Sequence, residues 1–329
     1  MRGHREGSTL THSSIPRPIE DTWQTWRARV DDELRRLIGS GDPDALFESM
    51  RYSVEAGGKR LRPLLVIATL EALGRDPVPA LPAACAIELV HTFSLIHDDL
   101  PALDDDDLRR GRPTNHVVFG EATAILAGDA LHALAFRVLS RDLLATYPAP
   151  LCLEAVECLS DAAVDGLARG QVADLQAEGR AMSREALLSI HERKTGALFR
   201  CAVRLGAILG EASAQQAADL DAFASSLGLA FQIADDVLDV TRSREELGKS
   251  PGKDERDGKA TYVQHYGLAG ARERVDEACQ RATVALASWG APAASLRAFA
   301  AYVLEQVAAR TSSGRLRSAP RVDCAEPAR

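Results

Sequence analysis

Two clusters of aspartate stand out in this chain because each lies among apolar residues. The first runs from His97 to Asp104 and the second from Gln232 to Asp239. A carboxylate in apolar surroundings is costly unless a cation neutralises it. Two such clusters therefore predict a cavity in which hard divalent cations join the protein to an anionic ligand.

The second cluster has the spacing of one helix face. At about 100° per residue, one side of a helix carries Gln232, Asp235, Asp236 and Asp239. Further back, the same side carries small or apolar residues, namely Ser225, Gly228 and Leu229. This pattern predicts a polar rim above a narrow apolar wall at the mouth of a deep pocket. The alternative, a solvated acidic face, would need lysine or glutamate between the aspartates.

The first cluster needs a break in the chain to bring its carboxylates together. Asp98 and Asp104 are separated by a rotation of roughly 600°, so a straight helix would point them in different directions. Pro101 lacks an amide donor and clashes with the preceding turn, so the helix should end or kink there and return Asp104 towards Asp98. The next acids, Asp105 to Asp107, fit a plain acidic loop as well as they fit a role in the site.

Basic residues that could complement the acids occur in three places. Gly57 to Pro63 joins two glycines to a lysine and two arginines, and backbone amides at such a junction can approach a phosphate. Arg109 to Arg112 follows the first cluster, and Lys194 lies on the apolar stripe between Ile190 and Leu198. A lysine there must reach solvent or meet an anion. Taken alone, the glycine-lysine-arginine string is more typical of a surface turn.

The segment Leu247 to Lys259 is rich in glycine and charge and follows the second cluster by about two helical turns. A solvated surface loop and a lid over a bound phosphate are both compatible with this composition and position.

The elements that must position these residues are helices. Helical periodicity is nearly continuous from about residue 20 to 310, and no segment shows the sustained alternation of a half-buried strand. Proline and glycine divide the chain into ten or more helices with short connections, which predicts a single-domain, all-α bundle. We expect a disordered leader at 1–18, the domain at 19–310 and a disordered tail at 311–329.

Composition excludes several classes of function. A net charge of -8 argues against binding nucleic acid or acidic lipid through bulk electrostatics. No apolar run approaches the ~20 residues that cross a bilayer, and no secretory signal is present, so we expect no membrane contact. The six cysteines are scattered, which indicates neither a zinc site nor a disulfide framework and favours a reducing cytoplasm.

The combination of motifs resembles the trans-isoprenyl diphosphate synthases from about residue 20 to 310. It includes the two aspartate motifs, Gly57 to Pro63, Gly170-Gln171, Lys194-Thr195-Gly196 and Gly248-Lys249 through Lys259. Within that family, the stretch from His97 to Asn115 is most similar to the bacterial farnesyl diphosphate synthases. The resemblance implies helices packed around a central cavity, a homodimer, three Mg²⁺ ions, and head-to-tail condensation of isopentenyl diphosphate with an allylic diphosphate.

The resemblance also implies a role for each matching residue. Asp98 and Asp104 would bind two ions with support from Asp99, and Asp235 would hold a third, with Asp236 and Asp239 acting partly through water. The residues implied for the allylic diphosphate are Arg109, Lys194, Gln232, Lys249 and Lys259. Those implied for isopentenyl diphosphate are Lys59, Arg62, His91 and Arg110. Thr195 would lie near the reacting carbons.

Product length should depend on Phe93 and its small neighbour Ser94. Phe93 precedes Asp98 by five residues, which is about 7.5 Å along a helix, where a bulky ring would block a growing chain. An aromatic residue there usually goes with short products in the family, so we expect the C15 product, with C10 and C20 as alternatives. Alternatively, Phe93 is simply part of the core.

Three other interpretations are possible. A class I terpene cyclase would share the metal chemistry but would not need Lys59, Arg62 and Arg110 for a second diphosphate. A non-catalytic regulatory subunit typically loses carboxylates from one motif, whereas both motifs are complete here. A helical scaffold would have no reason to place carboxylates on apolar faces.

Overall fold

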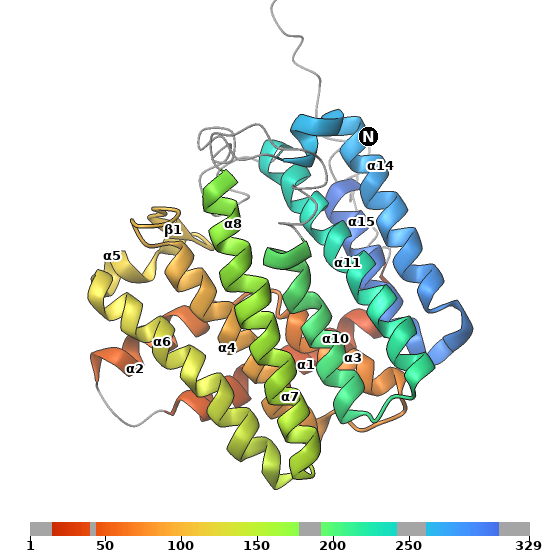
Figure 1. Cartoon of the computed structure of the whole chain (residues 1–329), viewed down its shortest axis with the longest axis horizontal. Coiled ribbons are helices and arrows are strands. Elements are labelled where there is room, and N and C mark those ends of the chain that lie inside the picture. The colour runs from red at the N-terminus through yellow and green to blue at the C-terminus, as the bar shows by residue number, and fades with distance from the viewer. Residues whose placement is uncertain (1–14, 40–43, 178–191, 242–260, 309–329) are drawn as a thin grey trace, which may run out of the picture.

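The computed structural model describes residues 15–39, 44–177, 192–241 and 261–308. Its longer helices are α1 (Arg17–Ile38), α2 (Ala45–Val54), α3 (Leu61–Ala72), α4 (Leu81–Asp98), α6 (Glu121–Arg137), α7 (Ala149–Asp161), α8 (Arg169–Ala177), α10 (Ala197–Leu209), α11 (Ala214–Thr241), α14 (Tyr262–Ala285) and α15 (Ala294–Ala308). They form the bundle in Figure 1. The predicted all-α fold is confirmed.

Short elements complete the described chain. The 3-10 turns are η1 (Val78–Ala80), η3 (Leu143–Ala145), η6 (Ala287–Trp289) and η7 (Ala291–Ala293). Three π-helical segments, which sequence periodicity did not predict, are η2 (Val138–Asp142), η4 (Ala162–Ala168) and η5 (Glu192–Gly196). A small helix, α5 (Asn115–Phe119), follows a two-residue antiparallel ladder between β1 (Leu108–Arg109) and β2 (Arg112–Pro113).

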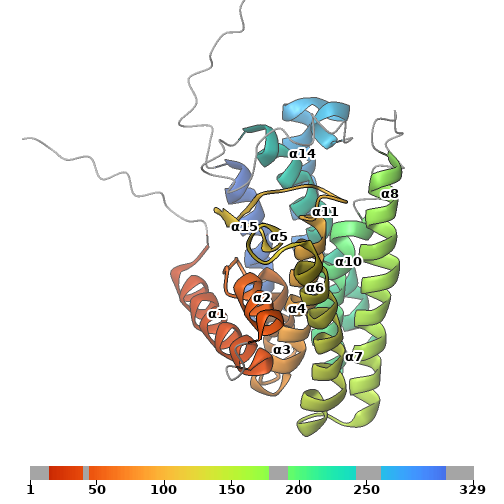
Figure 2. The ribbon, with the colours of Figure 1, turned by 90° about the vertical axis from the view of Figure 1, so that its left-hand side faces the viewer.

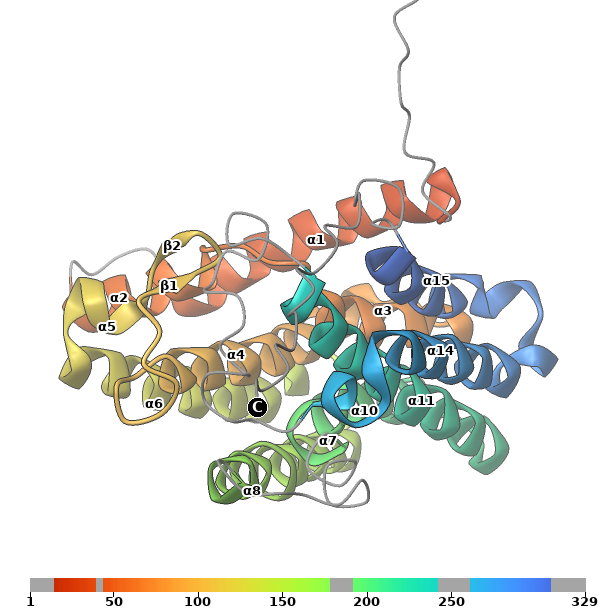
Figure 3. The same cartoon turned by 90° about the horizontal axis from the view of Figure 1, so that it is seen from above.

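The centre of the bundle is formed by α3 and α4. Both helices are apolar on nearly all sides, as expected of helices surrounded by protein. α4 packs against α1, α3, α6 and α10. Seen from above, α1 lies on one side of the molecule, α7 and α8 lie on the opposite side, and α4 and α10 lie between them (Figure 3). The arrangement places the carboxyl end of α4 within a shell of other helices.

Local sequence signals explain several helix ends. The side chain of Asp44 caps α2 by accepting a hydrogen bond of 2.8 Å from the amide of Leu46. Thr261 and Gln264 form a reciprocal capping box at the start of α14. α1 begins at Arg17, inside the segment expected to be a leader, and Ile15 before it is buried. The expected leader and tail otherwise lie outside the described residues.

Two stretches, Val78–Asp98 and Glu121–Ala145, are long and apolar enough to cross a membrane by length and composition alone. The expectation that no stretch approaches this length is therefore wrong by that measure. Of the two apolar windows, 61% and 44% are buried inside the protein, and core helices of soluble proteins pass the same test.

Candidate active site

The predicted chain reversal after α4 is confirmed. α4 ends at Asp98, three residues before Pro101, and the amide of Asp104 then donates a hydrogen bond of 2.8 Å to the carbonyl of Asp98. A second backbone bond, from the amide of Asp106 to the carbonyl of Asp99, extends the same turn. The break thus brings the two ends of the first aspartate motif together.

The carboxyl group of Asp98 lies in an environment that disfavours its charge. Burial raises the pKa of Asp98 to about 6, Lys194 opposes this increase, and the carboxylate of Asp104 adds to it. Two neighbouring half-buried carboxylates remain ionised together more readily when a cation lies beside them. This is the electrostatic condition for a site that binds a hard metal ion.

Asp99 is held by an arginine rather than left free. Nε of Arg109 donates to both carboxylate oxygens of Asp99, at 2.6 and 2.8 Å, and Nη2 of Arg109 lies 3.9 Å from Asp106. Asp106 is buried, so the plain acidic loop is the wrong interpretation at this position. Arg109, predicted to hold a diphosphate, forms an ion pair with the motif beside it in the protein without ligand.

The second cluster lies on α11, as its spacing predicted, but its members are not equally exposed. Asp235 is exposed, whereas Asp236 and Asp239 are buried. Asp236 accepts a hydrogen bond of 3.1 Å from Gln232 and another of 2.8 Å from the amide of Tyr262, the first residue of α14. The carboxylate of Asp236 therefore links two helices, while Asp235 faces outwards.

The apolar wall predicted below this cluster is only partly present. Gly228 is buried and packs so closely that a Cβ atom there would lie 3.1 Å from Cα of Gly196. Leu229 packs against the core, but Ser225 is exposed to solvent.

The guanidinium groups of Arg62 and Arg110 lie near the two aspartate clusters. Burial lowers the pKa of Arg62 to about 10, with Glu88 and Asp235 opposing the decrease and Arg110 adding to it. Nε of Arg62 is buried and makes no hydrogen bond within the described residues. Because Arg62 responds to both Asp235 and Arg110, it connects the two halves of the site.

On α4, His91 lies near the guanidinium groups of Arg62 and Arg110. Burial lowers the pKa of His91 well below its usual range, and Arg62, Arg110 and Arg109 lower it further. The imidazole is therefore neutral near pH 7, so it contributes hydrogen-bonding capacity without adding to the positive charge.

Gly58, the residue before Lys59, allows Arg110 to approach. A Cβ atom on Gly58 would lie 2.8 Å from Cζ of Arg110, and Gly57 and Gly58 both have positive φ angles. Lys59 is exposed, with Nζ 5.2 Å from the ring centroid of Tyr302. Because Gly58 has no side chain, it leaves room for the guanidinium of Arg110.

Lys194 meets an anion, which was one of the two alternatives expected for it. Its Nζ lies 2.6 Å from Oδ2 of Asp174 on α8. Gly170 permits the contact between the two segments, because a Cβ atom there would lie 2.8 Å from the backbone of Lys194. Thr195 follows Lys194 in η5, whereas Lys249 and Lys259 lie outside the described residues.

Phe93 belongs to a stack of rings between α4 and α6. Its centroid lies 4.6 Å from that of His132, which in turn contacts Phe136 at 5.2 Å. Ser94 donates a hydrogen bond of 2.9 Å to the carbonyl of His91. The half-buried ring of Phe93 is thus packed from one side by α6.

The donor types at this site suit Mg²⁺, which prefers carboxylate and phosphate oxygens. Within the described ranges, no three His, Cys, Asp or Glu side chains converge on one point as a ready-made cage. Carboxylates without a complete cage fit an ion that takes its remaining ligands from substrate oxygens and water.

Residues 43–288 match the family model described as Polyprenyl synthetase. The chain belongs to the polyprenyl synthetase family. A farnesyl diphosphate synthase from Geobacillus stearothermophilus is 45% identical over 302 residues, covering 92% of this chain and 99% of that protein. A chloroplastic geranylgeranyl pyrophosphate synthase from Capsicum annuum is 46% identical over 276 residues, covering 83% and 75% respectively.

Solved members of the polyprenyl synthetase family share the whole fold. An apo FPP/GFPP synthase from Zymomonas mobilis has a TM-score of 0.78 and 37% identity, covering 87% of this chain and 99% of that one. A geranyltransferase from Helicobacter pylori, complexed with magnesium and isoprenyl diphosphate, has a TM-score of 0.76 and 29% identity over 89% and 99%.

Sequence reasoning missed several supporting residues of this polyprenyl synthetase site. Arg60 forms a buried ion pair of 2.9 Å with Glu88 and a part-buried one of 2.8 Å with Asp31. The signal for Glu88 was available, because it is the one acid before Asp98 in the apolar helix α4. Asp174 gave no such signal, since nothing in its local sequence separates it from an exposed acid.

Proposed function

We propose that the protein is a prenyltransferase that condenses isopentenyl diphosphate with an allylic diphosphate and releases farnesyl diphosphate. One observation carries the proposal: the buried guanidinium of Arg62 has an Nε that makes no hydrogen bond within the described residues, and it lies near enough to Asp235 of the second aspartate cluster for that charge to oppose the lowering of its pKa. An enzyme that only ionises one diphosphate does not need that group, which argues against a terpene cyclase.

The allylic diphosphate is assigned to the space between the aspartate clusters. Asp98, Asp104 and Asp235 would hold Mg²⁺, three ions being expected from the resemblance to the family. Bound Mg²⁺ would neutralise the charge that develops on the leaving diphosphate. Lys194 and Arg109 are already paired with Asp174 and Asp99, so each can exchange a carboxylate for a phosphate oxygen.

Isopentenyl diphosphate is assigned to Arg62, Arg110, His91 and Lys59. The guanidinium groups would supply charge-assisted hydrogen bonds, and the neutral imidazole would add one donor. Burial and Arg110 lower the pKa of Arg62, and burial, Arg60 and Arg109 lower that of Arg110, so a bound anion would relieve the repulsion among these guanidinium groups. This gives the site a direct electrostatic reason to bind a diphosphate.

The C15 product is the assignment that Phe93 supports best. His132 on α6 packs against the ring of Phe93, so the ring cannot move towards α6. C10 and C20 remain the alternatives, the second in view of the geranylgeranyl pyrophosphate synthase among the relatives.

The active form is proposed to be a homodimer in the cytoplasm. Exposed apolar side chains gather on α6, α7, η4 and α8, namely Ile125, Leu126, Leu153, Val164 and Val172. α7 and α8 lie at the edge of the molecule opposite α1 in Figure 2, and exposed apolar groups of this kind mark contact surfaces.

The deciding experiment is incubation of the purified protein with labelled isopentenyl diphosphate, Mg²⁺ and each of the C5, C10 and C15 allylic starters. Chromatography after dephosphorylation should give C15 from the C5 and C10 starters and little elongation of the C15 starter. Cyclic or hydroxylated products without consumption of isopentenyl diphosphate would overturn the proposal in favour of a terpene cyclase.

A further inference from the structure

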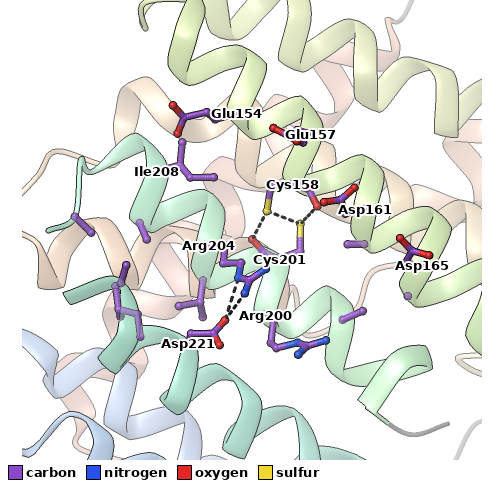
Figure 4. Close-up of a pocket in the computed structure, with 18 of the residues that line it drawn as sticks. Glu154, Glu157, Cys158, Asp161, Asp165, Arg200, Cys201, Arg204, Ile208 and Asp221 are labelled. Carbon is purple, nitrogen blue, oxygen red and sulfur yellow. Dashed lines mark hydrogen bonds and ion pairs between the residues drawn. The ribbon is translucent and has the colours of Figure 1, made fainter. Parts of the chain in front are cut away.

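A cavity of about 670 Å³ lies between α7, α10 and α11, and none of the predicted catalytic residues lines it. Figure 4 shows carboxylates such as Glu157 and Asp161 on one wall and guanidinium groups such as Arg200 and Arg204 on another. The walls thus carry both signs of charge, which suits a zwitterionic ligand of peptide size.

Two thiols from different helices meet at this cavity. Sγ of Cys158 on α7 lies 3.7 Å from Sγ of Cys201 on α10, and both residues line the cavity. Each sulfur also lies near the other residue's carbonyl oxygen, at 3.6 and 4.0 Å. Figure 4 shows the two sulfur atoms between the helices.

The two sulfurs are close enough to bond after a small rearrangement. A disulfide bond is about 2.05 Å long, so the sulfur atoms must approach by roughly 1.7 Å. Rotation of the two side chains can provide much of that movement. The other cysteines in the described part of the chain, Cys85, Cys152 and Cys279, are buried, and no contact between their sulfurs and another thiol is seen.

The two thiols are not equivalent. The hydrogen bond from Cys201 lowers the pKa of the Cys158 thiol, burial opposes this, and Arg204 favours it. The same hydrogen bond and burial raise the pKa of Cys201. Cys158 is half-buried whereas Cys201 is 2% exposed, so Cys158 is both the better nucleophile and the more accessible one.

We propose that Cys158 and Cys201 form a reversible dithiol–disulfide site whose co-reactant is a small peptide disulfide. The Cys158 thiolate attacks one sulfur of the co-reactant, forming a mixed disulfide and releasing one thiol. Cys201 then loses its proton and attacks the Cys158 sulfur, which releases the second thiol. The protein gives up two electrons and two protons, and the co-reactant becomes two thiols.

The new bond would join two segments that already meet elsewhere. Lys194 precedes Cys201 by seven residues on the η5–α10 segment, and Asp174 follows Cys158 on the α7–η4–α8 segment. The Lys194–Asp174 ion pair and the Cys158–Cys201 contact therefore connect the same two segments at different points along their length. Oxidation would fix one of these two connections covalently.

The test uses the full chain with Cys324→Ser, because Cys324 lies outside the described residues. Oxidised glutathione is the probe, and intact mass with peptide mapping is the measurement. We expect a mass loss of two hydrogen atoms, a cross-link between the peptides of Cys158 and Cys201, and reversal by dithiothreitol. The cross-link should also raise the melting temperature, because it constrains the unfolded chain.

Single substitutions identify the order of events. Cys201→Ser should stop at a stable mixed disulfide with glutathione on Cys158, and Cys158→Ser should give neither product because Cys201 is buried. Cys152→Ser, on the same helix as Cys158, is the matched control and should keep the cross-link. Absence of the cross-link in folded Cys324→Ser, or failure of Cys201→Ser to hold glutathione on Cys158, would overturn the proposal.

Discussion

Asp98 meets two demands that oppose each other. Its place in the site requires an ionised carboxylate, yet burial raises its pKa to about 6. A group whose pKa is raised on folding contributes stability only while it is protonated, and this contribution is lost as the pH rises through the folded pKa. Near pH 7, the charged Asp98 therefore destabilises the ligand-free protein.

Asp98→Asn should consequently separate stability from activity. We expect the free energy of unfolding near pH 7, without Mg²⁺, to rise by about 1–3 kcal/mol, following about 1.4 kcal/mol for each unit of raised pKa. Turnover should fall by at least about 100-fold, since groups aimed at developing charge have effects of that size. Denaturant unfolding and a product assay measure the two effects, and near-normal turnover would show that Asp98 holds no ion.

His91 gives a pH dependence of the opposite sign. Its pKa lies well below the usual value, so the unfolded chain takes up a proton near pH 6.5 before the folded protein does. The stability that this histidine provides is present above that pH and is lost as the pH falls.

We therefore expect the unfolding free energy to decrease between about pH 7 and pH 5, by up to roughly 1.4 kcal/mol per pH unit from His91. His91→Gln should flatten this part of the curve. Urea melts at several pH values provide the measurement, with His265→Gln on α14 as the control. An unchanged slope in His91→Gln would mean that His91 is as readily protonated in the folded protein as in the unfolded chain.

At the scale of elements, the chain reversal after α4 could be predicted from sequence because its cause is local. Pro101 limits the helix within one turn of itself, and the return of Asp104 follows from that. The partner of Lys194 could not be predicted in this way. Asp174 lies on another segment, and η5 is π-helical, so the 3.6-residue period used for this stripe does not apply there.

The second aspartate cluster shows the same difference between what local spacing predicts and what contacts with another helix decide. Its shared helix face was visible from spacing, but the burial of Asp236 beside the exposed Asp235 depends on where α14 begins. Sequence spacing gives the direction of a side chain on its own helix. It does not give the backbone amide that a second helix places against it.

The junction between α2 and α3 should control binding of one substrate only. In Gly58→Ala, the new Cβ would displace Arg110, so the KM for isopentenyl diphosphate should rise about tenfold while the KM for the allylic substrate changes little. Gly57→Ala is the matched control, because Gly57 also has a positive φ but a Cβ there meets nothing within 4 Å. Equal effects of both substitutions on KM would indicate backbone strain rather than displacement of Arg110.

The ring stack between α4 and α6 should set product length. If the ring of Phe93 blocks the growing chain, Phe93→Ala should replace C15 with C20 or longer products in chromatography of the dephosphorylated mixture. Phe136→Ala, at the other end of the same stack, should leave the product unchanged. An unaltered C15 profile in Phe93→Ala would mean that Phe93 only packs the core.

At the scale of the whole molecule, the exposed apolar side chains on α6 and α7 predict the contact between subunits. Leu126→Glu combined with Leu153→Glu should convert a dimer into monomers, because each glutamate would be buried without a partner. Light scattering after size exclusion measures the mass. Val284→Glu on α14 alters an equally exposed valine and should leave the dimer intact. A wild-type monomer at micromolar concentration would contradict the assignment.

The bond between Asp236 and Tyr262 also bears on how this enzyme can change over evolution. Residues 242–260 leave from the end of α11, and the chain returns to the same helix, where the carboxylate of Asp236 receives the amide of Tyr262. The entry and exit points of this segment are thus fixed by residues outside it. Doubling the length of such a connection costs only about 0.6 kcal/mol in closure entropy. Insertions can accumulate there without loosening the helices that carry the site.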